Sequence, residues 1–169
     1  DSARIVTISQ TVRSTGVSTR DASPANFIDW AAQNSVFSAM ACSRGWQANL
    51  SGGEEPERIR ATMASSQFFT VFKVNPIIGR AFGVDDAKPG NARVVVLSHG
   101  LWTRRYGADR NVIGHDLILD GEKFTVIGVM PPTFSPDGYG ELWVPSQTDV
   151  PTHPLSPNDD PRAMRAQID

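Results

Sequence analysis

The chain has 169 residues, of which 40% are hydrophobic and 20% are charged, a globular composition that excludes a disordered chain. Lysine and arginine are scattered and the net charge is −2, so the sequence lacks the basic patch of a nucleic-acid-binding protein. A single cysteine, Cys42, excludes an internal disulfide and a thiolate metal cluster, and no apolar run reaches the roughly 20 residues of a membrane-spanning helix.

The N-terminal part predicts a strand followed by a helix. Residues 4–13 are predicted to be extended. The helix begins at Ser23-Pro24, because a serine N-cap followed by proline is a common helix start. The face of this helix expected to be buried comprises Phe27, Trp30, Ala31, Phe37 and Met40, with a break near Asn34.

A hairpin and a short helix complete the first half. Residues 41–50 and 55–64 are predicted strands joined by a serine-glycine-glycine turn. The following helix is expected to be capped by Ser65 or Ser66, and it ends before Pro76. Its aromatic residues are Phe68, Phe69 and Phe72. The order in the first half is therefore β-α-β-β-α.

The second half predicts a strand, a helix and a hairpin. The apolar run Val94–Leu97 is typical of a strand buried on both faces. Ser98 stands at a helix N-cap and Gly107 at the helix end. The expected helical face comprises Leu101, Trp102, Arg105 and Tyr106.

Asp120-Gly121 is a strong hairpin signal. A two-residue turn there places Leu119 opposite Glu122 and Leu117 opposite Phe124. One face of the hairpin is then Leu117, Leu119, Phe124 and Val126, and the other is Ile118, Thr125 and Ile127. The first of these faces is expected to pack on the Val94–Leu97 strand, Leu101 and Trp102.

These elements predict an α+β fold with two lobes. Gly83–Asn91 is polar and rich in turn residues, and Glu141–Pro145 is a last short strand; both are expected to cross between the lobes. The stretch from Pro151 to Pro161 holds four prolines and is predicted to be a linker or loop.

No catalytic group, cofactor site or metal site is predicted. The order strand-Ser98-helix has the layout of a nucleophile elbow, but that turn needs a small residue where Val96 stands, and the adjacent His99 points away from the serine. His99, His115 and His153 lack metal-ligand spacing, and no glycine-rich nucleotide loop is present. Core packing is the first expectation for the aromatic residues. Trp46, Phe134 and Tyr139 are the best candidates for contact with a partner or substrate.

Several motifs closely resemble the MacB-like periplasmic core domain of ABC-transporter permeases, a group built from FtsX-like units. The match runs from about Ser23 to Pro145. Its most specific parts are G-R-x-F at 79–82, L-S-H-G-L-W at 97–102, V-I-G-H-D-L-I-L-D-G at 112–121 and V-I-G-V-M-P-P at 126–132.

The resemblance implies an extracytoplasmic, periplasmic domain between membrane helices of an inner-membrane permease. It implies a porter-like lobe of residues 1–82 with 146–169, and an inserted β-α-β-hairpin lobe of residues 83–145. A strand-helix-strand expected after the last strand is largely absent, so the chain is expected to be truncated or the first lobe incomplete. The implied partners are the permease's membrane helices, a cytoplasmic ATPase acting indirectly, a periplasmic adaptor and a second permease copy.

Two functions from different classes follow. The first is a domain of an export permease that transmits ATP-driven motion or contacts substrate or adaptor, without catalysis of its own. The alternative is a free-standing extracytoplasmic module that binds a peptide or glycan. The parent gene separates them, because several membrane spans around this chain support the permease and a short soluble reading frame supports the module.

Overall fold

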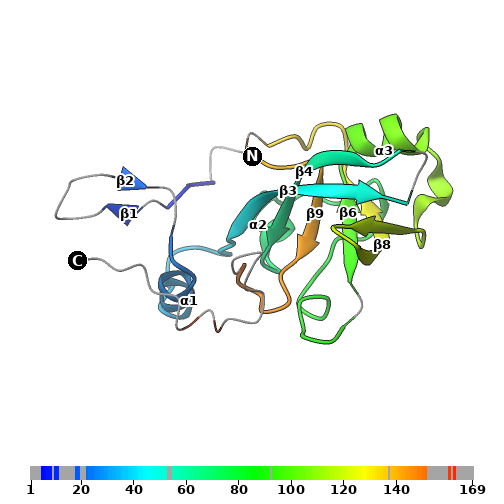
Figure 1. Ribbon diagram of the computed structural model, residues 1–169. Coiled ribbons are helices and arrows are strands. Elements are labelled where there is room, and N and C mark those ends of the chain that lie inside the picture. Colours follow the sequence, from blue (N-terminus) through cyan, green and yellow to red (C-terminus); the bar gives the residue numbers. More distant parts are fainter. Residues whose placement is uncertain are drawn as a thin grey trace.

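The described residues of the computed structural model form one seven-stranded mixed sheet, a two-stranded pair and short helices (Figure 1). These residues are 5–8, 10–11, 18–19, 22–52, 55–91, 93–136, 138–151, 160 and 162. The elements in chain order are β1 (Gln10–Thr11), β2 (Ser18–Thr19), α1 (Pro24–Ala32), β3 (Ser43–Ser51), β4 (Glu57–Ala64), α2 (Phe68–Phe72), β5 (Ile78–Gly79), β6 (Val94–Leu97), α3 (His99–Tyr106), the 3-10 helix η2 (Arg110–Val112), β7 (Asp116–Leu119), β8 (Glu122–Val129) and β9 (Leu142–Pro145).

Six strands of the large sheet close into a ring. The order is β5-β8-β6-β9-β4-β3-β7, and β7 also pairs with β8, so the sheet returns to one of its own strands. The closing contact is short, since Leu50 and Ser51 of β3 pair with Leu119 and Ile118 of β7. β5 pairs with Gly128 and Val129 at the end of β8, beyond the residues that pair with β7. The ring is therefore a small, partly closed barrel.

Every ring strand contributes apolar side chains to the inner core. The buried members of this core are Ala48, Leu50, Ile59, Ala61, Val95, Leu97, Leu101, Trp102, Val112, Leu117, Leu119, Val126, Val129, Leu142 and Val144. Leu101 and Trp102 come from α3, so this helix contributes directly to the packed interior. The interior is thus a packed core and not a channel, as in other barrels of few strands.

A second core lies on the outer face of the central strands. Its buried members are Ala64, Phe68, Phe69, Phe82, Val94, Val96, Met130, Phe134 and Trp143. The rings of Phe69 and Phe134 meet the Trp143 ring with centroid separations of 5.9 and 5.3 Å. Because β6 is packed on both faces, all four of its residues are buried, as the apolar run predicted.

The local predictions for the second half are confirmed. Leu119 pairs with Glu122 and Leu117 with Phe124, so the hairpin has the expected register. Asp120 and Gly121 have φ of 50° and 85°, the left-handed values that a tight hairpin turn requires. The inward face of this hairpin joins the inner core with the β6 strand and α3, also as expected.

The predicted helix caps hold at α1 and α3 and fail at α2. Ser23 Oγ accepts the N–H of Asn26 at 3.2 Å, and Ser98 Oγ accepts the N–H of Leu101 at 3.1 Å. At α2 the N-cap is Gln67, without a side-chain hydrogen bond. Ser65 and Ser66 bind other parts of the chain instead, and these contacts take precedence over capping.

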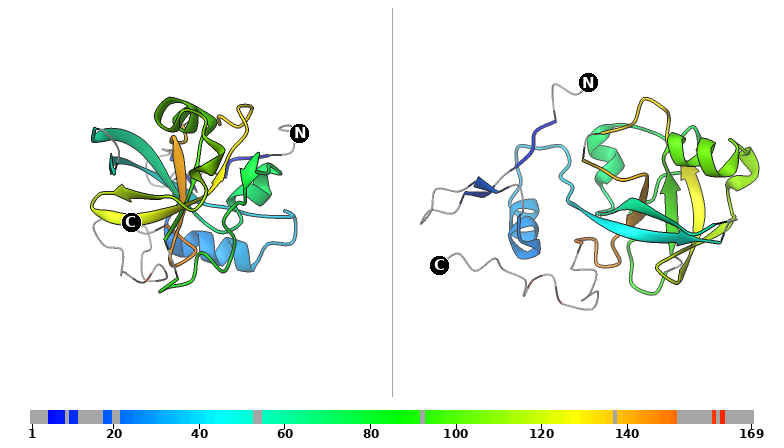
Figure 2. Two further views of the ribbon diagram at one scale, coloured as in Figure 1. Left: turned by 90° about the vertical axis from the view of Figure 1, so that its right-hand side faces the viewer. Right: turned by 45° about the horizontal axis from the view of Figure 1, so that its top comes forward.

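The buried face expected on α1 is wrong. Among its residues only Ala25 is buried, while Phe27 and Trp30 are half-buried and Ala31 is exposed. Phe37, expected in the same face, lies beyond the helix end and is 41% exposed. The reason is that α1 lies to one side of the ring instead of on the sheet, as Figure 1 and the right-hand view of Figure 2 show.

The N-terminal strand is also shorter than expected. Of the predicted strand 4–13, residues 5–8 carry no strand assignment, and only Gln10–Thr11 pairs, with Ser18–Thr19 of β2. Residues 4, 9, 12 and 13 lie outside the described residues, as do residues 152–159 of the proline-rich stretch.

The ring crosses the boundary expected at residue 83. β3 and β4 precede that boundary, β6 to β9 follow it, and all belong to one sheet. Glu141–Pro145, expected as a crossing, includes β9, which lies between β4 and β6 at the centre of the sheet. The extent of the porter-like lobe stays a prediction, because most of residues 146–169 lie outside the described part of the chain.

Candidate functional site

The chain enters and leaves the ring at the same place. Ser43, at the start of β3, pairs with Ala64, the last residue of β4, and Ala64 pairs with Pro145, the last residue of β9. The incoming and outgoing segments are therefore separated only by the end of β4. We call the segment that ends at Cys42 the incoming stem and the segment that begins at Ser146 the outgoing stem. The region where they meet is the stem junction, which we define by Cys42, Ser65, Ser66, Ser146 and Asp149.

Hydrogen bonds tie both stems to the segment after β4. On the incoming side, Cys42 N–H donates to Ser65 Oγ at 3.1 Å and Ser65 N–H donates to the Cys42 carbonyl at 2.9 Å. On the outgoing side, Ser146 N–H donates to the Ala64 carbonyl at 2.9 Å. The three serines are 2 to 5% exposed, so these bonds lie within the packed structure.

Asp149 completes the stem junction from outside the ring. Its Oδ1 accepts the Ser66 N–H at 2.6 Å, and its own N–H donates to the Ser146 carbonyl at 3.0 Å. Its φ of 58° is left-handed, a conformation that costs a non-glycine residue about 1 kcal/mol, although aspartate tolerates it better than most. The packing and hydrogen bonds of the junction therefore hold Asp149 in place against that cost.

Cys42 is half-buried beside Ser65 in the stem junction. Burial is the largest effect on its thiol and raises the pKa to about 12, while the hydrogen bond with Ser65 opposes the shift. A thiol with this pKa is a poor nucleophile at neutral pH. Cys42 therefore has a structural place in the junction.

The three aromatic residues predicted as contact candidates do not share a surface. Trp46 on β3 is half-buried against the inner core and donates its indole N–H to Asp120 Oδ2 at 3.0 Å. Phe134 and Tyr139 belong to the outer core, where Phe134 is 8% exposed and Tyr139 packs on Phe68. A contact role for these residues stays a prediction.

Ser98 acts as a helix cap in this structure. Its Oγ accepts a backbone N–H, and the neighbouring His99 turns its Nδ1 toward Thr103 Oγ1, at 3.4 Å. No base is therefore placed to take the serine proton within the described residues.

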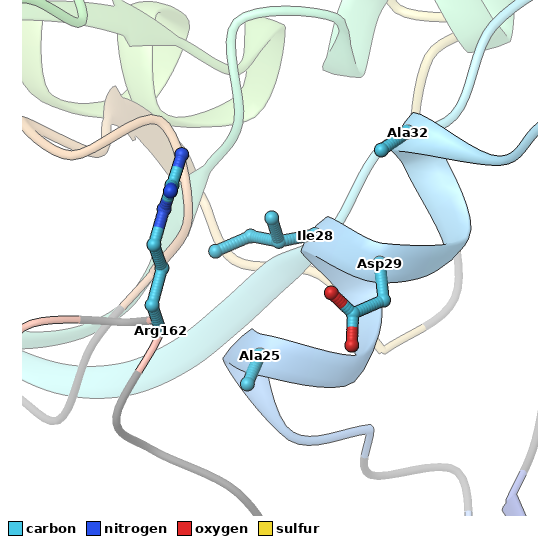
Figure 3. A pocket seen from close by; sticks show the side chains of 5 residues that line it. All are labelled: Ala25, Ile28, Asp29, Ala32 and Arg162. Carbon is cyan, nitrogen blue, oxygen red and sulfur yellow. The ribbon is translucent and has the colours of Figure 1, made fainter.

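A groove of about 360 Å³ lies beside α1 (Figure 3). Its walls are Ala25, Ile28, Asp29 and Ala32 of the helix, with Arg162 opposite. Figure 3 shows Ile28 pointing from α1 toward the segment that carries Arg162. With one carboxylate and one arginine among its lining residues, this groove lacks the nucleophile and base of a catalytic pair.

The described residues contain neither a candidate metal site nor a candidate membrane span. No group of three histidine, cysteine, aspartate or glutamate side chains in that part of the chain gathers in a way that could hold a metal ion. None of the helices there is long and apolar enough to cross a bilayer.

The stem junction could not be read from the sequence. Asp149 lies in an unremarkable Q-T-D-V-P segment, and its partner Ser66 is 83 residues earlier. The only hint of a special role for Asp149 is that aspartate tolerates a left-handed backbone, and this property does not distinguish it from the other aspartates of the chain.

The family described as MacB-like periplasmic core domain matches residues 1–168. No curated protein matches the chain. The extracellular domain of the ABC-type transporter YknZ from Gram-positive bacteria is 21% identical, with a TM-score of 0.58, over 71% of this chain and 60% of that one. The periplasmic region of MacB from Actinobacillus actinomycetemcomitans is 21% identical, with a TM-score of 0.58, over 87% and 60%.

A domain of a permease protein from Porphyromonas gingivalis is 19% identical, with a TM-score of 0.54, over 85% of this chain and 65% of that one. At these identities the likeness is one of fold. The chain spans about 60% of the length of the YknZ and MacB domains.

Proposed function

The chain belongs to the family of MacB-like periplasmic core domains, and on that premise we propose that it is the extracytoplasmic domain of an ABC-type export permease. In this role it has no catalysis of its own and transmits ATP-driven motion from the membrane helices to substrate or adaptor. A cytoplasmic ATPase supplies the energy, and a second permease copy completes the transporter.

The stem junction is the observation that carries this proposal. A domain that transmits motion needs a body that does not deform and a fixed point at which force enters it. The packed ring is suited to be the rigid body, because its interior is filled and each of its strands is hydrogen-bonded to two neighbours. The stem junction is suited to be the fixed point, because both stems are hydrogen-bonded to the end of β4 and the residues just after it.

The proposal is tested by distance measurements between spin labels in the full permease, with and without ATP. One pair of labels is placed at Gln47 on β3 and at Arg110 in η2, so that it reports on distances inside the ring domain. Both residues are exposed. The other pair, at Val36 and Ile118, joins the segment after α1 to the ring; these residues are 83% and 37% exposed. ATP should change the second distance and leave the first unchanged.

A matched pair of substitutions tests the junction itself. Asp149→Gly removes the carboxylate and accepts the left-handed backbone, whereas Asp149→Asn keeps an oxygen acceptor and also tolerates that backbone. The glycine variant should broaden the Val36–Ile118 distances and raise the rate at which the half-buried Cys42 reacts with thiol reagents, and the asparagine variant should do neither. If ATP leaves both distances unchanged, or if the glycine variant behaves as the wild type, transmission through the junction is wrong.

A further inference from the structure

The segment Gly83–Asn91 connects β5 to β6, and the chain is fixed to β8 on both sides of it. Before the segment, β5 pairs with β8, and the Arg80 N–H donates to the Ile127 carbonyl at 2.8 Å. After the segment, the Arg93 carbonyl accepts the Thr125 N–H at 3.0 Å, directly before β6. We call Gly83–Asn91 the strap, because its ends are fixed while its middle part is free to contact a third element.

An arginine–aspartate pair folds the strap. The Asp86 carboxylate accepts hydrogen bonds from both Nη atoms of Arg80, each at 2.7 Å, and from the Gly83 N–H at 2.9 Å. A two-point contact of this kind fixes the orientation of the two groups as well as their separation. The next residue, Ala87, is only 5% exposed, whereas Lys88 after it is exposed. The strap therefore has a defined conformation with one side turned inward.

The middle of the strap contacts the outgoing stem. Gln147 donates its side-chain N–H to the Asp86 carbonyl at 3.4 Å. This is a long hydrogen bond, so it is weak by itself. It nevertheless places the stem against the residue whose carboxylate folds the strap. Val150, three residues further along the stem, is 7% exposed, so the stem stays covered beyond this contact.

The outgoing stem is therefore hydrogen-bonded on two sides. Ser146 donates its N–H to the Ala64 carbonyl, and Asp149 accepts the Ser66 N–H; both bonds reach the end of β4 or the residues just after it. Gln147, which lies between Ser146 and Asp149 in the sequence, is bonded to the strap instead. The stem thus lies between two parts of the chain that are both fixed to the ring.

The incoming stem is hydrogen-bonded on one side. Among the described residues, the hydrogen bonds that join residues 38–42 to the rest of the structure are the two between Cys42 and Ser65. Both reach the segment after β4, and neither reaches the strap. A segment bonded on two sides is restrained in more directions than a segment bonded on one, so the two stems differ in how firmly the ring holds them.

We propose that the strap holds the outgoing stem on the ring, and that the Arg80–Asp86 pair keeps the strap in position. The outgoing stem then follows the ring more closely than the incoming stem. The consequence for transport rests on the proposed function, because it names the outgoing stem as the one through which motion enters the ring. The restraint itself belongs to the chain alone and is tested without a membrane or a nucleotide. A failure of this test therefore leaves the spin-label test of the permease function to be decided separately.

The test measures amide hydrogen exchange of the chain by proton–nitrogen NMR. Arg80→Gln removes the charge and the two-point contact with Asp86. The Asp149 amide should then exchange about five-fold faster, since the pair is partly exposed and solvent screens it, while the Cys42 amide should change by less than about two-fold. The buried Met130 amide, which donates to the Leu97 carbonyl at 2.8 Å, reports unfolding of the whole ring.

Two further variants separate the strap from a general effect of charge. Lys88→Gln removes the 2.6 Å ion pair between Lys88 and Asp85, which lies in the same strap but does not involve Asp86. It should leave the Asp149 amide within about two-fold of the wild type. Gln147→Met removes the donor to the strap and keeps a side chain of similar length. It should raise the exchange rate of the Asp149 amide about three-fold, with the Arg80–Asp86 pair intact.

Any of three results would overturn the proposal. The Asp149 amide exchanges at the wild-type rate in Arg80→Gln or in Gln147→Met, which means that the strap does not restrain the stem. The Asp149, Cys42 and Met130 amides accelerate by the same factor, which means that the pair only stabilises the whole domain. Lys88→Gln has the same effect as Arg80→Gln, which means that the contact between Arg80 and Asp86 has no special part in holding the strap.

Discussion

Asp120 joins the β7–β8 hairpin to a strand that lies some 70 residues earlier in the chain. Its Oδ1 accepts the backbone N–H of Asn49 at 2.9 Å and the Asn49 side-chain N–H at 3.0 Å, while Oδ2 accepts the Trp46 indole N–H. Its own N–H donates to the Asn49 carbonyl at 3.0 Å. The residue that makes the turn therefore also helps β3 and β7 to close the ring.

We expect Asp120→Ala to lower the free energy of unfolding by about 2 kcal/mol. The change removes three hydrogen bonds that are partly open to solvent and forces alanine into a left-handed backbone. Asp120→Asn keeps the Oδ1 acceptor for Asn49 and tolerates the backbone, so it should lose less than about 1 kcal/mol. Urea unfolding followed by tryptophan fluorescence measures both, and equal losses in the two variants would contradict this role.

At the residue scale the sequence predicts the turn but not its partner. Asp120-Gly121 fixes the hairpin register because the signal is local and the two strands follow each other. Trp46 and Asn49 carry no mark that identifies Asp120 as their acceptor. Trp46 was accordingly predicted as a contact candidate, whereas the structure shows its indole N–H already bound.

Among the elements, the segment after β5 is more ordered than its polar sequence indicates. Gly83–Asn91 was predicted as a lobe boundary, yet Asp86 in this segment forms two hydrogen bonds of 2.7 Å with the Arg80 guanidinium. Asp86 also accepts the Gly83 N–H at 2.9 Å. These bonds, with the Arg80 hydrogen bond as the main cause, hold the pKa of Asp86 below its usual range.

The Arg80–Asp86 pair should therefore stabilise the fold only above acidic pH. A carboxyl group whose pKa is lowered by folding contributes its full stability above its unfolded pKa of about 4 and loses it as the pH falls through the folded value. Asp86→Asn should cost about 1 kcal/mol at pH 7, since the arginine is partly exposed and solvent screens the pair.

Chemical unfolding of the wild type and Asp86→Asn between pH 2 and 7 tests this expectation. The difference between the two proteins should shrink toward zero at the acid end. Arg80→Gln should show the same loss of pH dependence, and a difference that is constant with pH would mean that the pair contributes no charge-dependent stability.

Element prediction succeeded where the determinants lie close together in the chain. The caps Ser23 and Ser98, the helix end at Gly107 and both hairpins follow from signals within a few residues. The buried face of α1 failed because apolar spacing tells which residues share a face, not whether another element covers that face. Ser65 and Ser66 were taken for helix caps because the partners that they bind, Cys42 and Asp149, are remote in the sequence.

For the whole molecule, the sequence predicts the fold class and the resemblance predicts the family, but neither shows that the ring closes. Closure depends on the pairing of β3 with β7 and of β4 with β9, which are contacts between segments far apart in sequence. The boundary at residue 83 was predicted because Gly83–Asn91 is polar and rich in turn residues and because the resemblance implies an inserted lobe, and neither reason tells whether the strands on its two sides share one sheet. In the structure, residues from both sides of that boundary fill the same inner core.

We expect a fragment of residues 41–151 to fold on its own. It includes all strands of the ring, both cores and every residue of the stem junction, whereas α1 contributes no buried residue to either core. The fragment should unfold cooperatively within about 1 kcal/mol of the full chain. Circular dichroism and urea unfolding measure this, and an unfolded or much weaker fragment would show that the N-terminal part is needed for the ring.

Ring closure also limits how a partner protein can attach. A strand with neighbours on both sides has no free backbone groups, so a second chain cannot extend the sheet there. The β3–β7 pairing reaches only Leu50 and Ser51, which leaves the rest of that β3 edge, residues 43–48, without a strand neighbour among the described residues. Arg44 and Gln47 on this edge are exposed, and charged or polar edges discourage unwanted strand addition. We therefore expect a protein that binds this domain to contact exposed side chains instead of adding a strand to this edge.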